Sequence, residues 1–203
     1  MLSGSLLSAI VGTGDISSVL IRVADNVTQM RVSTMAELVT SIGIVILAVL
    51  LYLVLQRQNR IIAFIALGLW LAEAIILAVS KIGAFALIPL SLEFVAVGAP
   101  EASHFQTLGA LLYNGVDRTG NDIHMLFYGV GGILWFYLFY RSKFMPRILS
   151  LRGMVAETIA LIGMIFLLCG IDVNILFFAQ IAALELVVGL WLLIKGIKER
   201  PAS

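Results

Sequence analysis

The sequence predicts an all-α integral membrane protein: a helical bundle of five or six transmembrane helices with an external re-entrant or amphipathic segment. Of its 203 residues, 61% are hydrophobic and 12% are charged, and the mean hydropathy is +1.08. Soluble domains carry about 25% charged residues. Crossing the hydrocarbon core of a bilayer takes about 20 apolar residues of helix. The stretches that meet this requirement are residues 38–55, 61–80, 123–140, 153–170 and 173–194.

Short connections predict that neighbouring spans are antiparallel. Residues 56–60 join the first two spans, and Ile171 and Asp172 alone separate the last two. Connections of this length hold consecutive helices side by side. The chain has no internal repeat or low-complexity tract, so we expect one transmembrane domain over residues 1–203.

Residues 81–122 form the predicted external segment. The apolar stretch 82–98 contains Pro89 and Glu93, and a further crossing there would invert the downstream charge bias, so we predict a re-entrant or interfacial segment. Residues 100–116 mix polar and apolar side chains in a pattern typical of an amphipathic helix on the membrane surface.

The basic residues predict the orientation, because Lys and Arg accumulate in short cytoplasmic loops. If the five spans alternate, most of the 13 Lys and Arg residues fall on one side. They are Arg57, Arg60, Arg141, Lys143, Arg147, Arg152, Lys195, Lys198 and Arg200. This side is predicted to be cytoplasmic and includes the C-terminus. The basic residues between 141 and 152 could also bind anionic lipid headgroups.

Two motifs near the end of the chain carry a resemblance. Residues 140–153 read YRSKFMPRILSLRG, and residues 185–196 read ELVVGLWLLIKG. They resemble the uncharacterised bacterial membrane family catalogued as domain of unknown function 4386, over roughly residues 33–196. The resemblance implies a bacterial inner-membrane location, and it puts Asp122 and His124 at the start of the helix before the first motif. It implies no activity.

The N-terminal residues 1–12 are too short to span a bilayer and lack the basic start of a signal peptide. Members of the family usually have a further N-terminal helix. Residues 1–12 are therefore expected to be the end of a truncated first helix, giving six spans, or a short interfacial segment.

Three spans each contain a single charged residue: Glu73, Glu157 and Glu185. A carboxylate in hydrocarbon is costly, so it is expected to face the bundle interior, a cavity or a partner. At about 1.5 Å of rise per residue, Glu73 and Glu185 lie roughly 10 and 16 Å from the outer ends of their spans, in one layer near the midplane. Glu157 lies roughly 6 Å from the cytoplasmic end. It is expected to reach back toward Arg152 or Arg147.

A facing pair of Glu73 and Glu185 would retain at least one proton, since burial and a like charge both disfavour the ionised form. Such a pair could bind a proton, a cation or a small ligand such as an amine. The alternative is that each carboxyl is neutral, bonds to a backbone carbonyl or to Gln180, and fixes helix packing.

A polar stripe is predicted on the third span and the residues before it. Asp117, Asn121, His124, Tyr128 and Trp135 are spaced 4, 3, 4 and 7 residues apart, so a helix carries them on one face. Glycines between Tyr128 and Trp135 allow a neighbouring helix to approach closely. The stripe could form an outer vestibule leading to the carboxylate pair, or an interfacial belt of the kind His, Tyr and Trp commonly make.

Metal binding is a weaker interpretation of the same region. Glu101 and His104 form one Glu-x-x-His pair, with Asp122 and His124 on the same side of the membrane, whereas di-metal bundles use two such pairs. No metal site is predicted. Asp122 is expected to cap the start of its helix together with Asn121.

The sequence also excludes several function classes. A net charge of +1 offers no footprint for nucleic acid. No phosphate-binding loop, nucleophile elbow or cofactor motif occurs. The leading hypothesis is a proton- or ligand-binding bundle in the lipid bilayer, with Glu73 and Glu185 at its centre. The alternatives are a non-catalytic partner subunit or sensor, whose protein partner the sequence does not name, and, last, a membrane-embedded enzyme.

Overall fold

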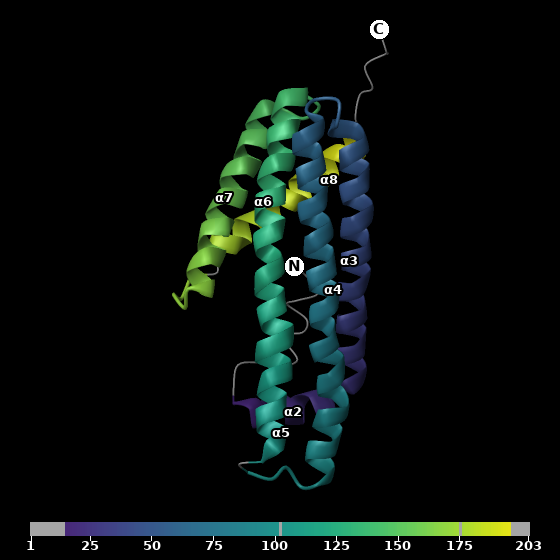
Figure 1. Ribbon diagram of the computed structural model, residues 1–203, viewed down its shortest axis with the longest axis vertical. Helices are drawn as coiled ribbons and strands as arrows, with labels where there is room; N and C mark the ends of the chain where they lie inside the picture. Colours follow the sequence, from purple (N-terminus) through teal and green to yellow (C-terminus); the bar gives the residue numbers. More distant parts are fainter. Residues whose placement is uncertain (1–14, 102, 175, 196–203) are drawn as a thin grey trace. The chain divides into compact units, whose positions relative to one another are not determined.

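Helices are the regular secondary structure of the residues that the structure describes. This computed structural model describes residues 15–101, 103–174 and 176–195, and no strand occurs within these ranges (Figure 1). The all-α prediction is confirmed. Contacts within the chain divide it into two compact units: unit 1 is Met1–Val45 with Ala74–His124, and unit 2 is Ile46–Glu73 with Met125–Ser203.

The helices follow one another with short connections. In chain order they are α2 (Ile16–Asp25), α3 (Val27–Leu55), α4 (Arg60–Ala96), α5 (His104–Ala110), the π-helix η1 (Leu111–Arg118), α6 (Thr119–Ser142), α7 (Arg147–Leu168) and α8 (Leu176–Lys195). Helices α3, α4 and α6 contribute residues to both units.

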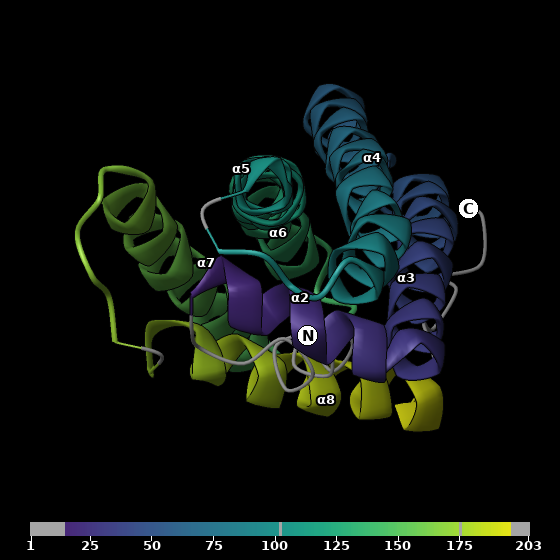
Figure 2. The ribbon, with the colours of Figure 1, turned by 90° about the horizontal axis from the view of Figure 1, so that it is seen from below.

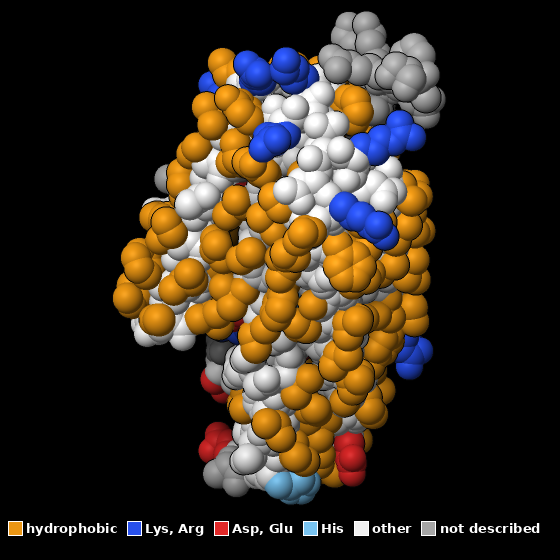
Figure 3. Space-filling model, turned by 45° about the horizontal axis from the view of Figure 1, so that its top comes forward, with side chains coloured by type: hydrophobic (Ala, Val, Ile, Leu, Met, Phe, Trp, Pro, Cys, Tyr) orange, Lys and Arg blue, Asp and Glu red, His pale blue; other side chains and the backbone are white. Residues whose placement is uncertain are grey.

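Four helical segments are long and apolar enough to cross a membrane: Val27–Leu55, Arg60–Ala96, His104–Ser142 and Arg147–Leu168. Helix α8 contains a shorter apolar run, Phe177–Trp191. Hydrophobic side chains cover most of the surface visible in Figure 3. An exposed apolar surface of this kind is suited to lipid, so the chain is an integral membrane protein.

Helix α4 differs from the prediction, which ended a span at Ser80 and made 82–98 re-entrant or interfacial. It continues without a break from Arg60 to Ala96, through Lys81 and with Pro89 inside it. At about 1.5 Å per residue its 37 residues extend about 55 Å. The predicted break is wrong because the charge of Lys81 is paired inside unit 1, as described below. Pro89 costs one backbone donor, which membrane helices tolerate.

The segment predicted as a surface helix over 100–116 also differs. It belongs to one uninterrupted helical stretch, His104–Ser142, in which η1 is the π-helical part. A Cβ added at Gly83 of α4 would lie 2.6 Å from the carbonyl oxygen of Leu112. The absence of a side chain at Gly83 therefore lets this stretch pack along α4, and the packing overrides the amphipathic pattern.

Helix α2 is the amphipathic element of unit 1. Its first turn is capped by Asp15, whose carboxylate accepts a hydrogen bond from the Ser18 backbone N–H at 3.3 Å. Val19, Leu20 and Val23 are buried on one face. Figures 1 and 2 both show α2 lying across the neighbouring helices of its unit. It packs on α5, where Gly109 leaves room for Leu20.

Unit 2 contains one connection that is as short as predicted, between α3 and α4. The connection between α7 and α8 is longer than the two residues expected, because α7 ends at Leu168 and α8 begins at Leu176. The turn between α3 and α4 is capped by Asn59, whose side-chain oxygen accepts hydrogen bonds from the N–H groups of Ile61 and Ile62, both at 3.1 Å. Helices α7 and α8 contact each other beside their connection, where Phe177 packs against Gly163. Both views show α8 running obliquely to α6 and α7 (Figures 1 and 2).

Candidate functional site

Unit 2 brings together polar side chains from four helices. Glu73 lies on α4, Tyr128 on α6, Glu157 on α7 and Glu185 on α8. Glu73 is 3% exposed and Glu157 is 2% exposed, whereas Glu185 lies at the unit's surface. Each of the three carboxylates interacts electrostatically with the other two. These four residues are called the carboxylate cluster below.

Tyr128 is the hydrogen-bonding centre of the carboxylate cluster. Its hydroxyl donates to Oε1 of Glu185 at 2.6 Å. The same hydroxyl interacts with the carboxylate of Glu157. Trp70 fixes the position of Tyr128: its indole N–H donates to the Tyr128 carbonyl at 3.2 Å, and the two rings stack at 6.0 Å between centroids.

Glycines of α6 make room for the cluster. A Cβ added at Gly132 would lie 2.8 Å from Cδ of Glu157, and one added at Gly131 would clash with the Trp70 ring. The carboxyl group of Glu157 and the indole of Trp70 therefore occupy space that any larger residue of α6 would fill. The sequence-based expectation that these glycines allow close helix approach is confirmed.

Two carboxylate oxygens in the cluster are buried without a bonding partner. Oε2 of Glu73 and Oε2 of Glu157 have no hydrogen bond within the described ranges. Buried polar atoms are nearly always hydrogen-bonded, because leaving them unpaired costs free energy. A proton on such an oxygen, or a bound donor, would reduce that cost.

The structure corrects the prediction for Glu157. The sequence put it near the cytoplasmic interface, four residues into a span that began at Gly153. Helix α7 begins at Arg147, so Glu157 is a further turn and a half into the helix, and it contacts the cluster rather than the arginines. Glu73 and Glu185 interact electrostatically.

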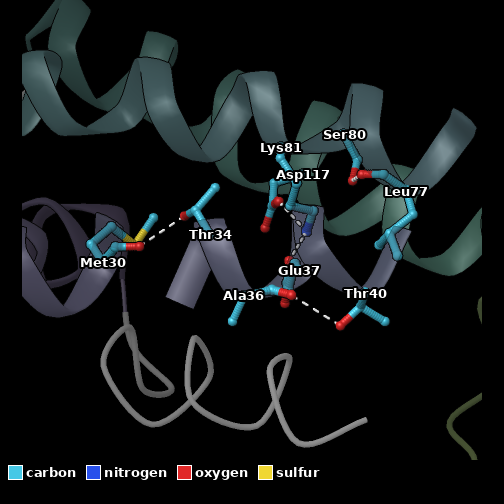
Figure 4. A network of polar contacts seen from close by, with 9 residues as sticks. All are labelled: Met30, Thr34, Ala36, Glu37, Thr40, Leu77, Ser80, Lys81 and Asp117. Atoms are coloured by element: carbon cyan, nitrogen blue, oxygen red, sulfur yellow. Dashed lines mark hydrogen bonds and ion pairs between the residues drawn. The ribbon is translucent and has the colours of Figure 1, made fainter. Parts of the chain in front are cut away.

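Unit 1 contains a second polar group, an ion triad that the sequence analysis did not single out. Nζ of Lys81 on α4 lies 2.5 Å from Oε2 of Glu37 on α3 and 2.8 Å from Oδ1 of Asp117 on η1. All three side chains are at most 4% exposed. Figure 4 shows them converging from three helices. The signal in the sequence was a lone lysine within the apolar residues 61–98.

The remaining predicted site residues, His124, Asn121 and Asp122, lie on α6. His124 is 8% exposed, interacts with the backbone of Gly120 and Asn121 and with the charge of Lys81, and its Nδ1 has no hydrogen-bond partner in the described part of the chain. Asn121 and Asp122 are half-buried within a continuous helix, so the predicted cap is wrong.

The predicted stripe is therefore divided between two sites. Asp117 and His124 lie in unit 1 beside Lys81, whereas Tyr128 and Trp135 lie in unit 2. Trp135 is buried with its ring edge toward Trp70, at 6.0 Å between centroids. Asp117 belongs to η1, whereas His124, Tyr128 and Trp135 all belong to α6.

The described residues contain no group of three or more His, Cys, Asp or Glu side chains arranged to hold a metal ion. Glu101 and His104, considered above as a ligand pair, belong to no such group; the His104 ring lies 4.2 Å from that of Phe105. Within these ranges the carboxylate cluster offers oxygen atoms to protons or hydrogen-bond donors, without the geometry of a metal centre.

Fold and site together define an all-helical integral membrane protein with ionisable side chains in its helical core. The model of the family described as domain of unknown function (DUF4386) matches residues 1–196, and the chain belongs to this family. No curated protein and no solved structure matches the chain. The family resemblance of the two motifs is thereby confirmed.

Proposed function

We propose that this protein binds protons within the membrane at the carboxylate cluster of Glu73, Tyr128, Glu157 and Glu185. The observation that carries the proposal is the pair of unpartnered, buried oxygens on Glu73 and Glu157, next to a third carboxylate. Ionisation of all three groups would put two charges in a buried medium of low dielectric constant, where they repel each other and the nearby charge of Glu185. Retained protons relieve that repulsion.

Tyr128 supports a role in proton transfer as well as storage. Its hydroxyl donates to Glu185 and interacts with Glu157. A protonated Glu157 could donate to the phenol oxygen while the phenol proton passes to Glu185. The net result would be movement of one proton from a buried carboxyl group to a surface one, with Tyr128 regenerated.

The same oxygens are suited to an organic ammonium group, the small ligand that the sequence analysis also considered. An ammonium group carries several N–H donors and one positive charge, which would satisfy the unpartnered oxygens of Glu73 and Glu157. Binding of such a ligand would release the protons that the cluster holds. The cluster therefore holds protons when no amine is bound, and an amine would replace them.

The membrane orientation is part of the proposal. Arg57 and Arg60 lie at the turn between α3 and α4, and Arg141, Lys143 and Arg147 lie at the turn between α6 and α7. Because such clusters mark cytoplasmic loops, we assign these turns and the C-terminus to the cytoplasm of a bacterial cell, with the protein in the inner membrane.

Infrared difference spectroscopy of the purified protein in lipid nanodiscs tests the proposal directly. Protonated carboxyl groups give a C=O stretching band that ionised carboxylates lack. We expect this band at neutral pH in the native protein and a weaker band in Glu73→Gln and Glu157→Gln. The matched control is Glu93→Gln, because Glu93 is an exposed carboxylate on the same helix as Glu73.

A second measurement separates proton binding from a packing role. In proteoliposomes with an imposed pH gradient, a pH-sensitive dye reports proton movement, which we expect Tyr128→Phe to slow. A neutral-pH spectrum without the carboxyl band would contradict proton binding. If the carboxyl C=O band is unchanged in Glu73→Gln and Glu157→Gln while both variants unfold at a lower temperature, the carboxylates serve helix packing, as in a partner subunit.

A further inference from the structure

A pocket opens at the turn between α6 and α7 in unit 2. Its volume is about 480 Å³. The lining residues are Lys143, Phe144, Met145, Pro146, Arg147 and Trp191. Four of these belong to the α6–α7 turn, Arg147 is the first residue of α7 and Trp191 lies on α8. The basic residues of the pocket therefore come from the turn and the start of α7, and α8 contributes an aromatic one.

The two basic residues of this pocket belong to an ordered part of the backbone. The guanidinium carbon of Arg147 lies 5.5 Å from the centre of the Tyr140 ring, which is within the range of a cation–π contact. The Lys143 backbone N–H donates to the Phe139 carbonyl at 3.1 Å, and the Phe144 N–H donates to the Ser142 hydroxyl at 3.2 Å. Both cations are therefore attached to ordered backbone.

Lys143 occupies a backbone conformation that favours glycine. Its φ angle is +58°, at the position directly after the last residue of α6. Helices commonly end on such a left-handed residue, and it is usually Gly because other side chains are strained there. Strain of this kind points to a functional reason for the side chain. Here Lys143 lines the pocket.

The other side of the pocket is apolar and adjoins exposed hydrophobic surface. Trp191 lines the pocket, and on the same helix Leu190 and Ile194 are exposed. Ile148, next to Arg147 on α7, is 73% exposed. Trp side chains favour the boundary between headgroups and hydrocarbon. The pocket thus combines two cations with a surface that suits acyl chains.

We infer that this pocket binds the phosphate of an anionic phospholipid headgroup, with Lys143 and Arg147 contacting the phosphate and Trp191 packing against the glycerol and the start of the acyl chains. Arg recognises phosphate through paired N–H donors, and Lys adds a point charge. A free phosphate would satisfy the cations and leave the aromatic side unused. The lipid satisfies both sides, so it is the occupant that the lining favours.

Binding of lipids to the full chain, purified in detergent, tests the inference by native mass spectrometry. The probes are phosphatidylglycerol and phosphatidylcholine with identical acyl chains, and inorganic phosphate as competitor. We expect the native protein to retain phosphatidylglycerol preferentially. Lys143→Gly and Arg147→Gln are each expected to weaken this retention about tenfold, the loss of one charge-assisted contact.

Lys143→Gly separates binding from folding, because it removes the ammonium group and also relieves the left-handed backbone strain. Its thermal unfolding temperature is expected to stay the same or rise while retention falls. The matched control is Arg57→Gln, since Arg57 is an exposed cation at the α3–α4 turn and is not among the residues that line the pocket. Retention in this control is expected to match the native protein within twofold.

Trp191→Leu distinguishes a lipid from a free phosphate. For a bound lipid, this variant weakens retention of phosphatidylglycerol and inorganic phosphate displaces the lipid only poorly. Efficient displacement by inorganic phosphate, with retention unchanged in Trp191→Leu, would overturn the assignment to a lipid. If Arg57→Gln loses as much phosphatidylglycerol retention as Lys143→Gly, the lipid binds through diffuse surface charge and not in this pocket. The same conclusion would follow if the native protein retained phosphatidylcholine as well as phosphatidylglycerol.

Discussion

Nζ of Lys81 lies 2.8 Å from Oδ1 of Asp117, so a buried ion pair joins helix α4 to the π-helical turns before α6. Glu37 of α3 contacts the same ammonium group from the other side, at 2.5 Å. A lysine that a membrane sequence would otherwise exclude is thereby retained inside unit 1. The pair also explains why α4 continues past Ser80.

Removing the cation of this triad should destabilise unit 1 strongly. In Lys81→Met, Glu37 and Asp117 would remain as two buried carboxylates without a counter-charge, and breaking a buried pair in this way costs about 3–5 kcal/mol. We expect a clearly lower thermal unfolding temperature in detergent. The triple variant Lys81→Met, Glu37→Gln, Asp117→Asn should recover most of the loss, and a single variant that unfolds like the native protein would refute the role of the pair.

Gly83 should tolerate no larger residue. A Cβ there would lie 2.6 Å from the Leu112 carbonyl oxygen and 2.9 Å from Cβ of Val116, and backbone cannot move aside as a flexible side chain can. Overpacking of this kind costs about 1–3 kcal/mol, so Gly83→Leu should unfold at a lower temperature. Gly68→Ala is the control on the same helix. It has nothing within 4 Å and should be neutral or gain up to about 1 kcal/mol of helix propensity.

Tyr128→Phe should change the chemistry of the cluster more than its packing. The Trp70 stacking is kept, whereas the 2.6 Å hydrogen bond to Glu185 is lost, at a cost of about 1 kcal/mol. We expect a small drop in unfolding temperature together with a shift of the carboxyl infrared band. Tyr52→Phe is the control, because Tyr52 meets Phe64 through its ring edge at 6.3 Å and lies outside the cluster. A shift of equal size in the carboxyl infrared band of Tyr52→Phe would contradict a specific role of the Tyr128 hydroxyl in the cluster.

Pro89→Ala tests the continuity of α4. If residues 82–96 are helical, restoring the missing backbone N–H should stabilise the helix by about 1–3 kcal/mol and slow amide hydrogen exchange in this segment. Pro146→Ala serves as the comparison, since Pro146 lies at the N-cap of α7 rather than inside a helix. Rapid exchange throughout 82–96 in the native protein would show that the segment is not a helix.

Composition and periodicity were sufficient for the helical class, because an apolar segment in lipid must satisfy its backbone hydrogen bonds internally. They also located Glu73, Glu157 and Glu185, since a charge inside an apolar span stands out. The limits of α4 could not be predicted in the same way. Its continuation depends on whether Lys81 finds counter-charges, and these come from Glu37 and Asp117, far away in the sequence.

Depth along a span predicted that Glu73 and Glu185 share a layer. The predicted depth of Glu157 was wrong, because α7 begins at Arg147, six residues before the predicted start of the span. A spacing rule put Asp117 and Tyr128 on one stripe. Their partners are different: Asp117 in η1 pairs with Lys81, and Tyr128 in α6 donates to Glu185, and a spacing rule cannot supply these partners.

The sequence by itself determined that this protein is helical, that it lies in a membrane, and which side chains are too polar for their surroundings. These properties follow from side-chain hydrophobicity and from charge, which each residue carries wherever it lies. Only the tertiary structure decided the partners: Lys81 with Glu37 and Asp117, and Tyr128 with Glu185 and Glu157. A partner requires close approach between separate helices, and glycines such as Gly83 and Gly132 permit that approach only where the helices actually meet.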